Sequence, residues 1–142
     1  KNSPVAVLEN VPGGGRRMGA KLEELAEVAA NLKAFGSRFG ICLDFAHLWG
    51  AGYEISNAQK AKEFWMDFKN PNQLVLLHLN NSKLALGCHL DQHEHLANGH
   101  IPSEVYQYAL RHWPANAAIL ETPKSPADAD QKNVNFLKSL IQ

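Results

Sequence analysis

The stretch Phe39-Gly-Ile-Cys-Leu-Asp44 is a short apolar run that ends at a carboxylate. A continuous apolar run of this length, bounded by turn residues, is typical of a strand buried on both faces of a parallel sheet. The same pattern occurs three more times, at residues 4–9, 73–78 and 117–121. The sequence therefore predicts four strands of one kind.

Amphipathic helical segments follow these runs. Each carries apolar residues three and four positions apart, so that one face can pack against a sheet. The alternation of apolar strands with such helices predicts an α/β fold whose parallel strands are joined by right-handed crossovers. Four helical segments are predicted. The first spans residues 22–35 and would end at Gly36, and the second begins at a cap formed by Ser56 or Asn57. The third begins at Pro102-Ser103, and the fourth spans residues 127–141.

Each predicted strand ends in a side chain of a type that binds metal ions. These residues are Glu9, Asp44, His78 and Glu121. The carboxyl ends of parallel strands meet at one edge, where parallel α/β folds build their chemistry. A single carboxylate at a strand end is usually just solvated, but four ligand types ending four successive strands indicate one convergent site.

A second group of ligand types lies around the segment Leu77–His95. Asp91 and His93 are two residues apart, which places them on the same side of an extended segment, and His47 lies three residues after Asp44. Imidazole and carboxylate are ligands of Zn²⁺ above all, with Mn²⁺ as the alternative ion. The competing interpretation is a polar surface loop that happens to hold histidines.

The composition limits the class of protein. A chain of 142 residues with 45% hydrophobic content can form one domain with a core. The formal net charge is zero, so contact with nucleic acid would have to be local. Two cysteines are too few for a disulfide framework and indicate a reducing compartment.

No apolar run approaches the ~20 residues that span a bilayer, and no signal peptide is visible. We therefore expect an intracellular protein with no membrane partner. The start at Lys1 indicates a processed product or a piece of something larger.

Six motifs resemble, in order and spacing, the endonuclease IV family of zinc-dependent apurinic/apyrimidinic (AP) endonucleases of base-excision repair. Together they cover nearly the whole chain. The motifs are Leu8-Glu9-Asn10, Cys42-Leu-Asp-Phe-Ala-His47, Ala51-Gly-Tyr53, His78-Leu-Asn80, Asp91-Gln-His93 and Leu120-Glu-Thr-Pro123.

The resemblance implies a (β/α)8 TIM barrel with a trinuclear zinc cluster at its C-terminal mouth. Residues 1–142 correspond to the C-terminal half of that barrel, with four βα units. Four strands cannot close a barrel, and an open parallel sheet exposes two edges. The N-terminal half is therefore expected to be lost or left out of this chain, or to be supplied by a second chain.

The resemblance also implies a role for each ligand. Glu9 would bridge two zinc ions, and Glu9 and Glu121 would orient the nucleophile. Arg16, Arg17 and Lys83, in loops near the mouth, are predicted DNA contacts, or alternatively solvated surface charge. Around one of the two ions that Glu9 bridges, the implied ligands are Glu9, Asp44, His78 and Glu121. Around the third ion they are His47, Asp91 and His93.

Three positions depart from the family pattern without removing a metal ligand. Asn81 replaces an aspartate, Gln92 replaces an arginine, and Ala97-Asn98-Gly99 replaces a Gly-Glu-Gly-like turn. These changes remove charge near the expected path of the phosphates. They bear on substrate affinity and strand preference more than on metal binding.

The expected activity is hydrolysis of double-stranded DNA on the 5′ side of an abasic site, leaving a 3′-hydroxyl, with little or no activity for this segment alone. The expected location is the cytoplasm and nucleoid, or the nucleus or an organelle in a eukaryote. One alternative is a single-metal sugar isomerase or epimerase on the same barrel, which would not need His47, Asp91 and His93. Another is an inactive half-barrel that serves as a structural or DNA-binding part of a larger assembly.

Overall fold

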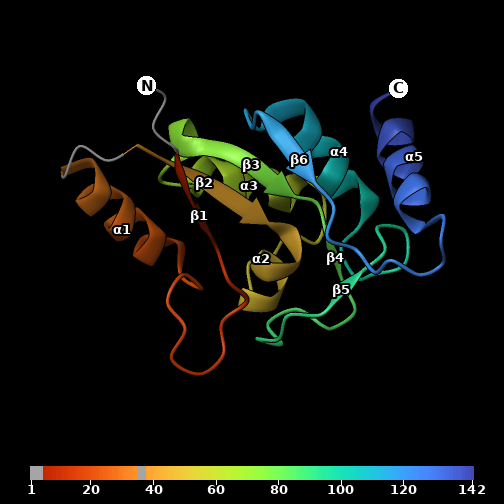
Figure 1. Cartoon of the computed structure of the whole chain (residues 1–142), viewed down its shortest axis with the longest axis horizontal. Helices are drawn as coiled ribbons and strands as arrows, with labels where there is room; N and C mark the ends of the chain where they lie inside the picture. Colours follow the sequence, from red (N-terminus) through yellow and green to blue (C-terminus); the bar gives the residue numbers. More distant parts are fainter. Residues whose placement is uncertain (1–4, 35–37) are drawn as a thin grey trace.

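The computed structural model describes residues 5–34 and 38–142 (Figure 1). The predicted start of the first run at Pro4 and the predicted helix stop at Gly36 lie outside these residues. The elements are β1 (Ala6–Glu9), α1 (Leu22–Ala34), β2 (Phe39–Asp44), α2 (Phe45–Ala51), α3 (Ala58–Asp67), the 3-10 turn η1 (Pro71–Gln73), β3 (Leu74–His78), β4 (Asn81–Ser82), β5 (His93–Glu94), α4 (Ser103–His112), β6 (Ala117–Ile119) and α5 (Ala129–Ile141).

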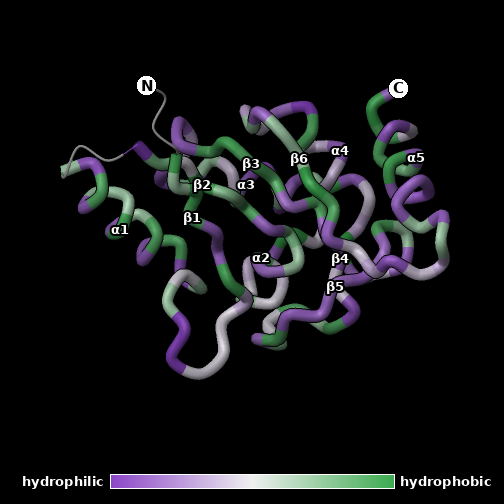
Figure 2. Tube along the Cα trace, in the orientation of Figure 1, coloured by the Kyte–Doolittle hydropathy of each residue, from purple (hydrophilic) through white to green (hydrophobic). Residues whose placement is uncertain are grey.

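The main sheet has four parallel strands in the order β1-β2-β3-β6. Its register pairs Asp44 with His78, so the last residues of β2 and β3 lie side by side. The last residue of β1, Glu9, pairs with Cys42, two residues before the end of β2. Figure 2 shows β3 as a hydrophobic segment, as the run of leucines predicts. The predicted parallel sheet of βα units is confirmed.

The core lies between the central strands and the helices α3 and α4, which are behind the sheet in Figure 1. Aromatic rings fill this layer. The ring of Phe45 lies 5.4 Å from that of Tyr106 and 5.2 Å from that of Trp113, measured between centroids. Trp65 of α3 stacks on Trp113 at 5.2 Å. Such aromatic pairs add stabilisation beyond the apolar area they bury, so this layer fixes α3 and α4 against the sheet.

The prediction that all four runs are buried on both faces is right for β2 and wrong for β1 and β6. Val7 of β1 is 44% exposed, and Ile119 of β6 is 45% exposed. The reason is position, since these two strands are the outer members of the sheet and each pairs on one side only. An apolar strand with an unpaired edge is normally covered by a further strand or by another packed segment.

Helix α2 follows β2 directly, and the sequence patterns above do not predict it. The Asp44 side chain caps its first turn by accepting from the His47 N–H at 2.8 Å, and Gly52 ends it with a left-handed conformation. Six of its seven residues are buried. A helix buried on all sides has no amphipathic period, so only its capping residues could have indicated it.

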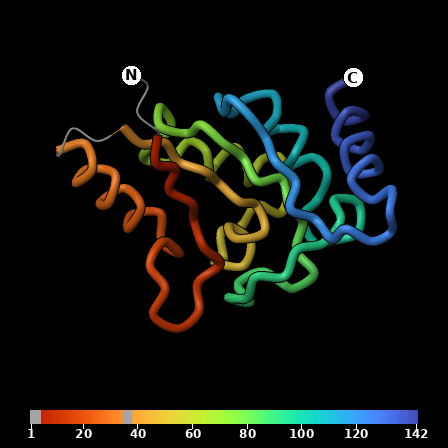
Figure 3. Tube along the Cα trace, in the orientation of Figure 1, coloured from red at the N-terminus to blue at the C-terminus, as the bar shows by residue number. Residues whose placement is uncertain are grey.

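The segment after β3 contains a second, two-stranded sheet. Strands β4 and β5 form an antiparallel pair in which Asn81 is opposite Glu94 and Ser82 is opposite His93. Figure 3 places this segment at the same end of the molecule as the loop that follows β1. Among the described residues, no helix has the length and apolarity needed to cross a membrane.

Candidate metal centre

The four strand-end residues converge on one point. The Nδ1 atom of His78 lies 2.9 Å from Glu9 Oε1 and 3.2 Å from Glu121 Oε2. It also lies 3.8 Å from Asp44 Oδ2. One donor atom from each of the four residues lies within 4.8 Å of the others, close enough to hold a metal ion. The register of the parallel sheet aligns Asp44 with His78, whereas Glu9 pairs with Cys42. The prediction that Glu121 ends its strand is wrong, because β6 ends at Ile119 and Glu121 lies two residues beyond it.

A second group of donors lies next to the first. Asp91 Oδ2 is 3.3 Å from His47 Nε2, and Asp91 Oδ1 is 3.0 Å from His93 Nε2. Asp44 belongs to both groups, because its Oδ2 atom is 3.8 Å from His93 Nε2. Helix α2 carries His47 and the strand β5 begins at His93. The structure thus brings all seven predicted ligands together.

The two imidazoles of the second group are held in one orientation by backbone carbonyls. His47 Nδ1 bonds to the Asn10 carbonyl at 2.8 Å, and His93 Nδ1 bonds to the Glu121 carbonyl at 3.1 Å. A carbonyl only accepts, so each Nδ1 carries a proton, and in the neutral imidazole each Nε2 then presents a lone pair. Both Nε2 atoms are buried and lack a hydrogen-bond partner among the described residues. This is the arrangement of imidazoles that bind metals through Nε2, so the residues fit a metal ion.

The electrostatics of the cluster favour a cation. Burial raises the pKa of Asp44, whose side chain is fully buried. The hydrogen bond from His78 lowers the pKa of Glu9. Hydrogen bonds to Cys42 and to Glu9 raise the pKa of His78 to about 11. His78 therefore keeps a proton where the carboxylates converge, and a divalent ion at the same place would supply that positive charge instead.

Two buried asparagines hold Asp44, Asn10 through its backbone and Asn80 through its carboxylate, a role that the motif comparison does not assign to them. Asn10 accepts from the Asp44 N–H at 2.7 Å and donates to the Asp44 carbonyl at 3.1 Å. Asn80 donates to Asp44 Oδ2 at 2.6 Å and accepts from the Glu121 N–H at 2.7 Å. The signal in the sequence is an asparagine one or two residues after a ligand, as in Glu9-Asn10 and His78-Leu-Asn80.

Replacing Asn80 with alanine is expected to weaken metal binding by about 10- to 100-fold, the usual cost of losing a partner of a ligand. The Asp44 carboxylate would lose the donor that orients it, and the Glu121 N–H would lose its acceptor. Competition with a chromogenic zinc chelator measures the affinity. Asn135→Ala on the exposed side of α5 is the matched control. An Asn80→Ala protein with unchanged affinity would show that Asn80 has no influence on the metal.

The predicted DNA contacts lie on the surface around this cluster. Arg16 and Arg17 are exposed in the loop after β1, and they line a groove that also includes Asp91. Lys83 is exposed beyond β4, where its N–H donates to the Gln92 carbonyl at 3.1 Å. Trp49 is buried, and its indole N–H donates to the Leu84 carbonyl at 3.0 Å, so it packs within the molecule.

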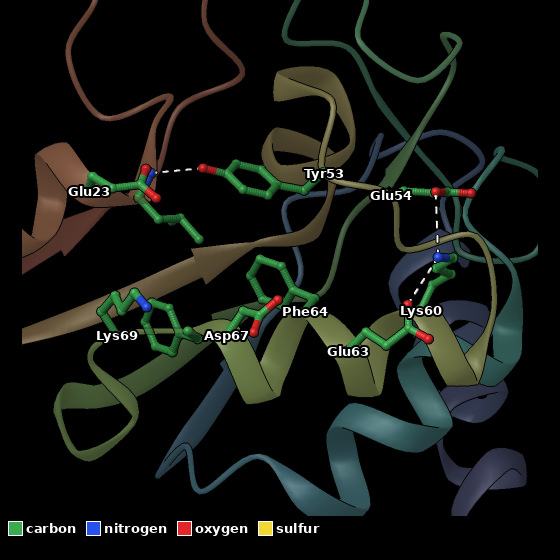
Figure 4. A pocket seen from close by; sticks show the side chains of 10 residues that line it. Glu23, Tyr53, Glu54, Lys60, Glu63, Phe64, Asp67 and Lys69 are labelled. Carbon is green, nitrogen blue, oxygen red and sulfur yellow. Dashed lines mark hydrogen bonds and ion pairs between the residues drawn. The ribbon is translucent and has the colours of Figure 1, made fainter.

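A separate cavity of about 370 Å³ lies between α1 and α3 on the outer side of the sheet (Figure 4). Figure 4 shows Tyr53 at its edge, whose hydroxyl accepts from the Leu22 N–H at 2.8 Å. It also shows Lys60, which pairs with Glu63 at 3.0 Å. None of the seven ligands is among the described residues that line this cavity. It is therefore not part of the metal centre.

Comparison with known proteins agrees with this fold. A family model described as a xylose isomerase-like TIM barrel matches residues 2–140. The crystal structure of endonuclease IV from Thermus thermophilus superimposes with a TM-score of 0.82 at 31% identity, covering 97% of this chain and 50% of that one. These two matches confirm the predicted TIM-barrel class.

Curated relatives define the group more narrowly. A probable endonuclease 4 from Halorhodospira halophila is 36% identical over 148 residues, which is 100% of this chain and 49% of that protein. Apurinic-apyrimidinic endonuclease 1 from Saccharomyces cerevisiae is 35% identical over 122 residues, covering 82% of this chain and 33% of that protein. The chain belongs to the xylose isomerase-like TIM-barrel family and, within it, to the endonuclease IV group. It spans about half the length of the curated relatives it matches.

Proposed function

We propose that the protein is a metal-dependent AP endonuclease that hydrolyses double-stranded DNA on the 5′ side of an abasic site and leaves a 3′-hydroxyl. The observation that carries this proposal is the second donor group. The buried Nε2 atoms of His47 and His93 face Asp91 beside the four strand-end ligands. A single-metal isomerase needs only the strand-end group, whereas a phosphodiester benefits from several cations around one phosphate. The names of the relatives support an AP endonuclease activity.

The seven ligands suit Zn²⁺, with Mn²⁺ as the alternative, and we propose up to three ions in the complete barrel. Bound ions would supply Lewis acidity that activates a water molecule and neutralises the phosphate. Glu9 contacts both imidazole groups, at 2.9 Å from His78 and 3.5 Å from His47, which suits a bridging ligand. Glu121 is 46% exposed, so its carboxylate can orient a nucleophile at the open side of the cluster. An abasic nucleotide has little stacking to lose and enters such a site at low cost.

We propose that an N-terminal half completes the barrel, either in the same polypeptide or as a second chain, with residues 1–142 as the C-terminal half. The exposed apolar side chains of β1 and β6 support this, because closure of a barrel would cover both outer strands. The chain alone is then expected to have little activity. We place the complete protein with its DNA in the cytoplasm and nucleoid, or in a nucleus or organelle.

Incision of a synthetic duplex with one abasic site is the direct test. We expect the full-length protein to cut 5′ of the lesion, to lose this activity with a chelator, and to recover it with Zn²⁺. Glu121→Gln should cut far more slowly, because the amide cannot serve as an anionic ligand or base. Normal cutting by Glu121→Gln would count strongly against the mechanism.

Counting bound metals by atomic emission separates the nuclease from the isomerase. The nuclease requires more than one ion per protein, and the isomerase requires one. The isomerase remains the second candidate because the family model that matches is xylose isomerase-like and the strand-end group alone can hold an ion. One ion per full-length protein, together with an intact abasic duplex, would favour it.

A further inference from the structure

The cavity of about 370 Å³ between α1 and α3 has no role in the metal centre (Figure 4). Its volume is that of a small-molecule site, commonly roughly 300–1,000 Å³. One of its lining residues, Tyr53, belongs to the motif Ala51-Gly-Tyr53, which contributes no metal ligand. The cavity is therefore a candidate site for a ligand of its own.

Three aromatic rings in the wall of the cavity form an aromatic corner, which consists of Tyr53, Phe64 and Phe68. Tyr53 and Phe64 lie edge to face, with ring centroids 5.6 Å apart and planes inclined by 76°. Phe68 stacks on Phe64 at 6.2 Å, with planes inclined by 14°. The face of an aromatic ring attracts a cation placed within roughly 6 Å of its centre, and rings at a steep angle can contact one cation from two sides.

Contacts on both sides fix the aromatic corner. The Tyr53 hydroxyl accepts from the Leu22 N–H at 2.8 Å, which ties this ring to the first residue of α1. Phe64 and Phe68 are four positions apart, so they lie on one side of α3 and its C-cap. Phe68 is buried, with 6% of its surface exposed. The rings are thus held in place by the fold before any ligand binds.

Carboxylates outnumber ammonium groups around the aromatic corner. Lys60 pairs with Glu63 at 3.0 Å and lies 4.0 Å from Glu54, so this lysine is neutralised within the wall. Glu23 and Asp67 form no ion pair with any residue that the structure describes. Figure 4 shows Glu23 beside the Tyr53 hydroxyl and Asp67 beside Phe64. The charged lining residues are Glu23, Glu54, Glu63, Asp67, Lys60 and Lys69, a set with a negative sum that favours a cation.

We propose that this cavity binds a small organic cation of the quaternary-ammonium class, with its methyl groups against Tyr53 and Phe64 and its charge near Glu23 and Asp67. Such a cation combines an apolar surface with a full positive charge, and aromatic cages bind it through the faces of their rings. The described lining residues include none of the seven metal ligands. The proposal therefore stands or falls separately from the proposed endonuclease activity.

Choline and its neutral analogue dimethylbutanol, in which carbon replaces the nitrogen, test the proposal with the full-length protein. We expect choline to bind saturably and roughly tenfold more tightly than the analogue, because the rings and the carboxylates attract only the charged compound. The resonances of the choline methyl protons should shift upfield on binding, because these groups would lie over ring faces. A metal chelator should leave this binding unchanged. Equal binding of the two compounds, or no binding of choline, would overturn the proposal.

Substitutions in the wall show whether choline binds in this cavity. Phe64→Leu keeps an apolar side chain but removes a ring face, so it should weaken binding by roughly fivefold and abolish the upfield shift. Asp67→Asn changes an exposed residue and leaves the core intact. It should weaken binding by roughly threefold at low salt. Asp130→Asn, on exposed α5, is the matched control and should bind choline normally.

The sign of the effect at Lys69 is a further check. Lys69 is exposed and lines the same cavity, so Lys69→Gln should strengthen choline binding by removing a like charge. Weaker binding by Lys69→Gln would contradict a cation site. If Phe64→Leu and Asp67→Asn both bind choline as the wild-type protein does, the cation binds elsewhere and the proposal falls.

Discussion

Asp44→Asn is expected to remove most metal binding and to lower incision activity by more than about 100-fold, which exceeds the usual cost of losing an outer partner. Asp44 is the residue shared by both donor groups. Its carboxylate is fully buried, so no water can replace a lost ligand at little cost. The substitution keeps the size of the side chain and its acceptor for the His47 N–H, so the cap of α2 is expected to survive.

Metal content by atomic emission and incision of the abasic duplex measure this effect in the full-length protein. Asp67→Asn is the matched control, because Asp67 is an exposed residue of α3 that lines the outer cavity in Figure 4. It should keep full metal content and activity. An Asp44→Asn protein that holds the wild-type number of ions would exclude the shared role of this carboxylate.

Asn81→Ala is expected to lower the free energy of unfolding by about 3 kcal/mol, the largest effect on stability among these substitutions. Several buried backbone groups would lose their hydrogen-bond partner. The Asn81 side chain accepts from the N–H groups of Ser82 and Ile101, each at 2.8 Å. It donates to the carbonyls of Leu96 and Ile101 at 2.8 and 2.9 Å. A Cβ on Gly99 would overlap the Asn81 Oδ1 atom, so the chain can approach only because glycine is there.

This substitution also tests how the second donor group is held. The segment that Asn81 secures carries Asp91 and His93, so its release should lower metal content as well as the free energy of unfolding. Urea unfolding of the full-length protein measures the stability, and Asn135→Ala on exposed α5 is the control. A decrease in the free energy of unfolding of less than about 1 kcal/mol would mean that water molecules form hydrogen bonds with these backbone groups when the side chain is removed.

The relation between sequence and structure differs from element to element. The runs that end at Glu9, Asp44 and His78 were predictable, because apolar strands have a clear pattern and parallel strands align their ends. Helix α2 was not, because it is buried all round and lacks an amphipathic period. The prediction of full burial failed for β1 and β6, because the pattern of a strand does not say whether a neighbour covers its edge.

The sequence by itself determined where β1, β2 and β3 end and the types of donor available, since side-chain chemistry and the pattern of an apolar strand are local properties. Only the tertiary structure decided that His47 and His93 aim their Nε2 atoms at Asp91, and that Asn10 and Asn80 bracket Asp44. Those arrangements depend on carbonyls and amides from segments more than 25 residues apart, as in the bond from His93 to the Glu121 carbonyl with a separation of 28. Folding alone brings such groups together, because no local rule of the chain specifies which distant backbone group an imidazole will meet.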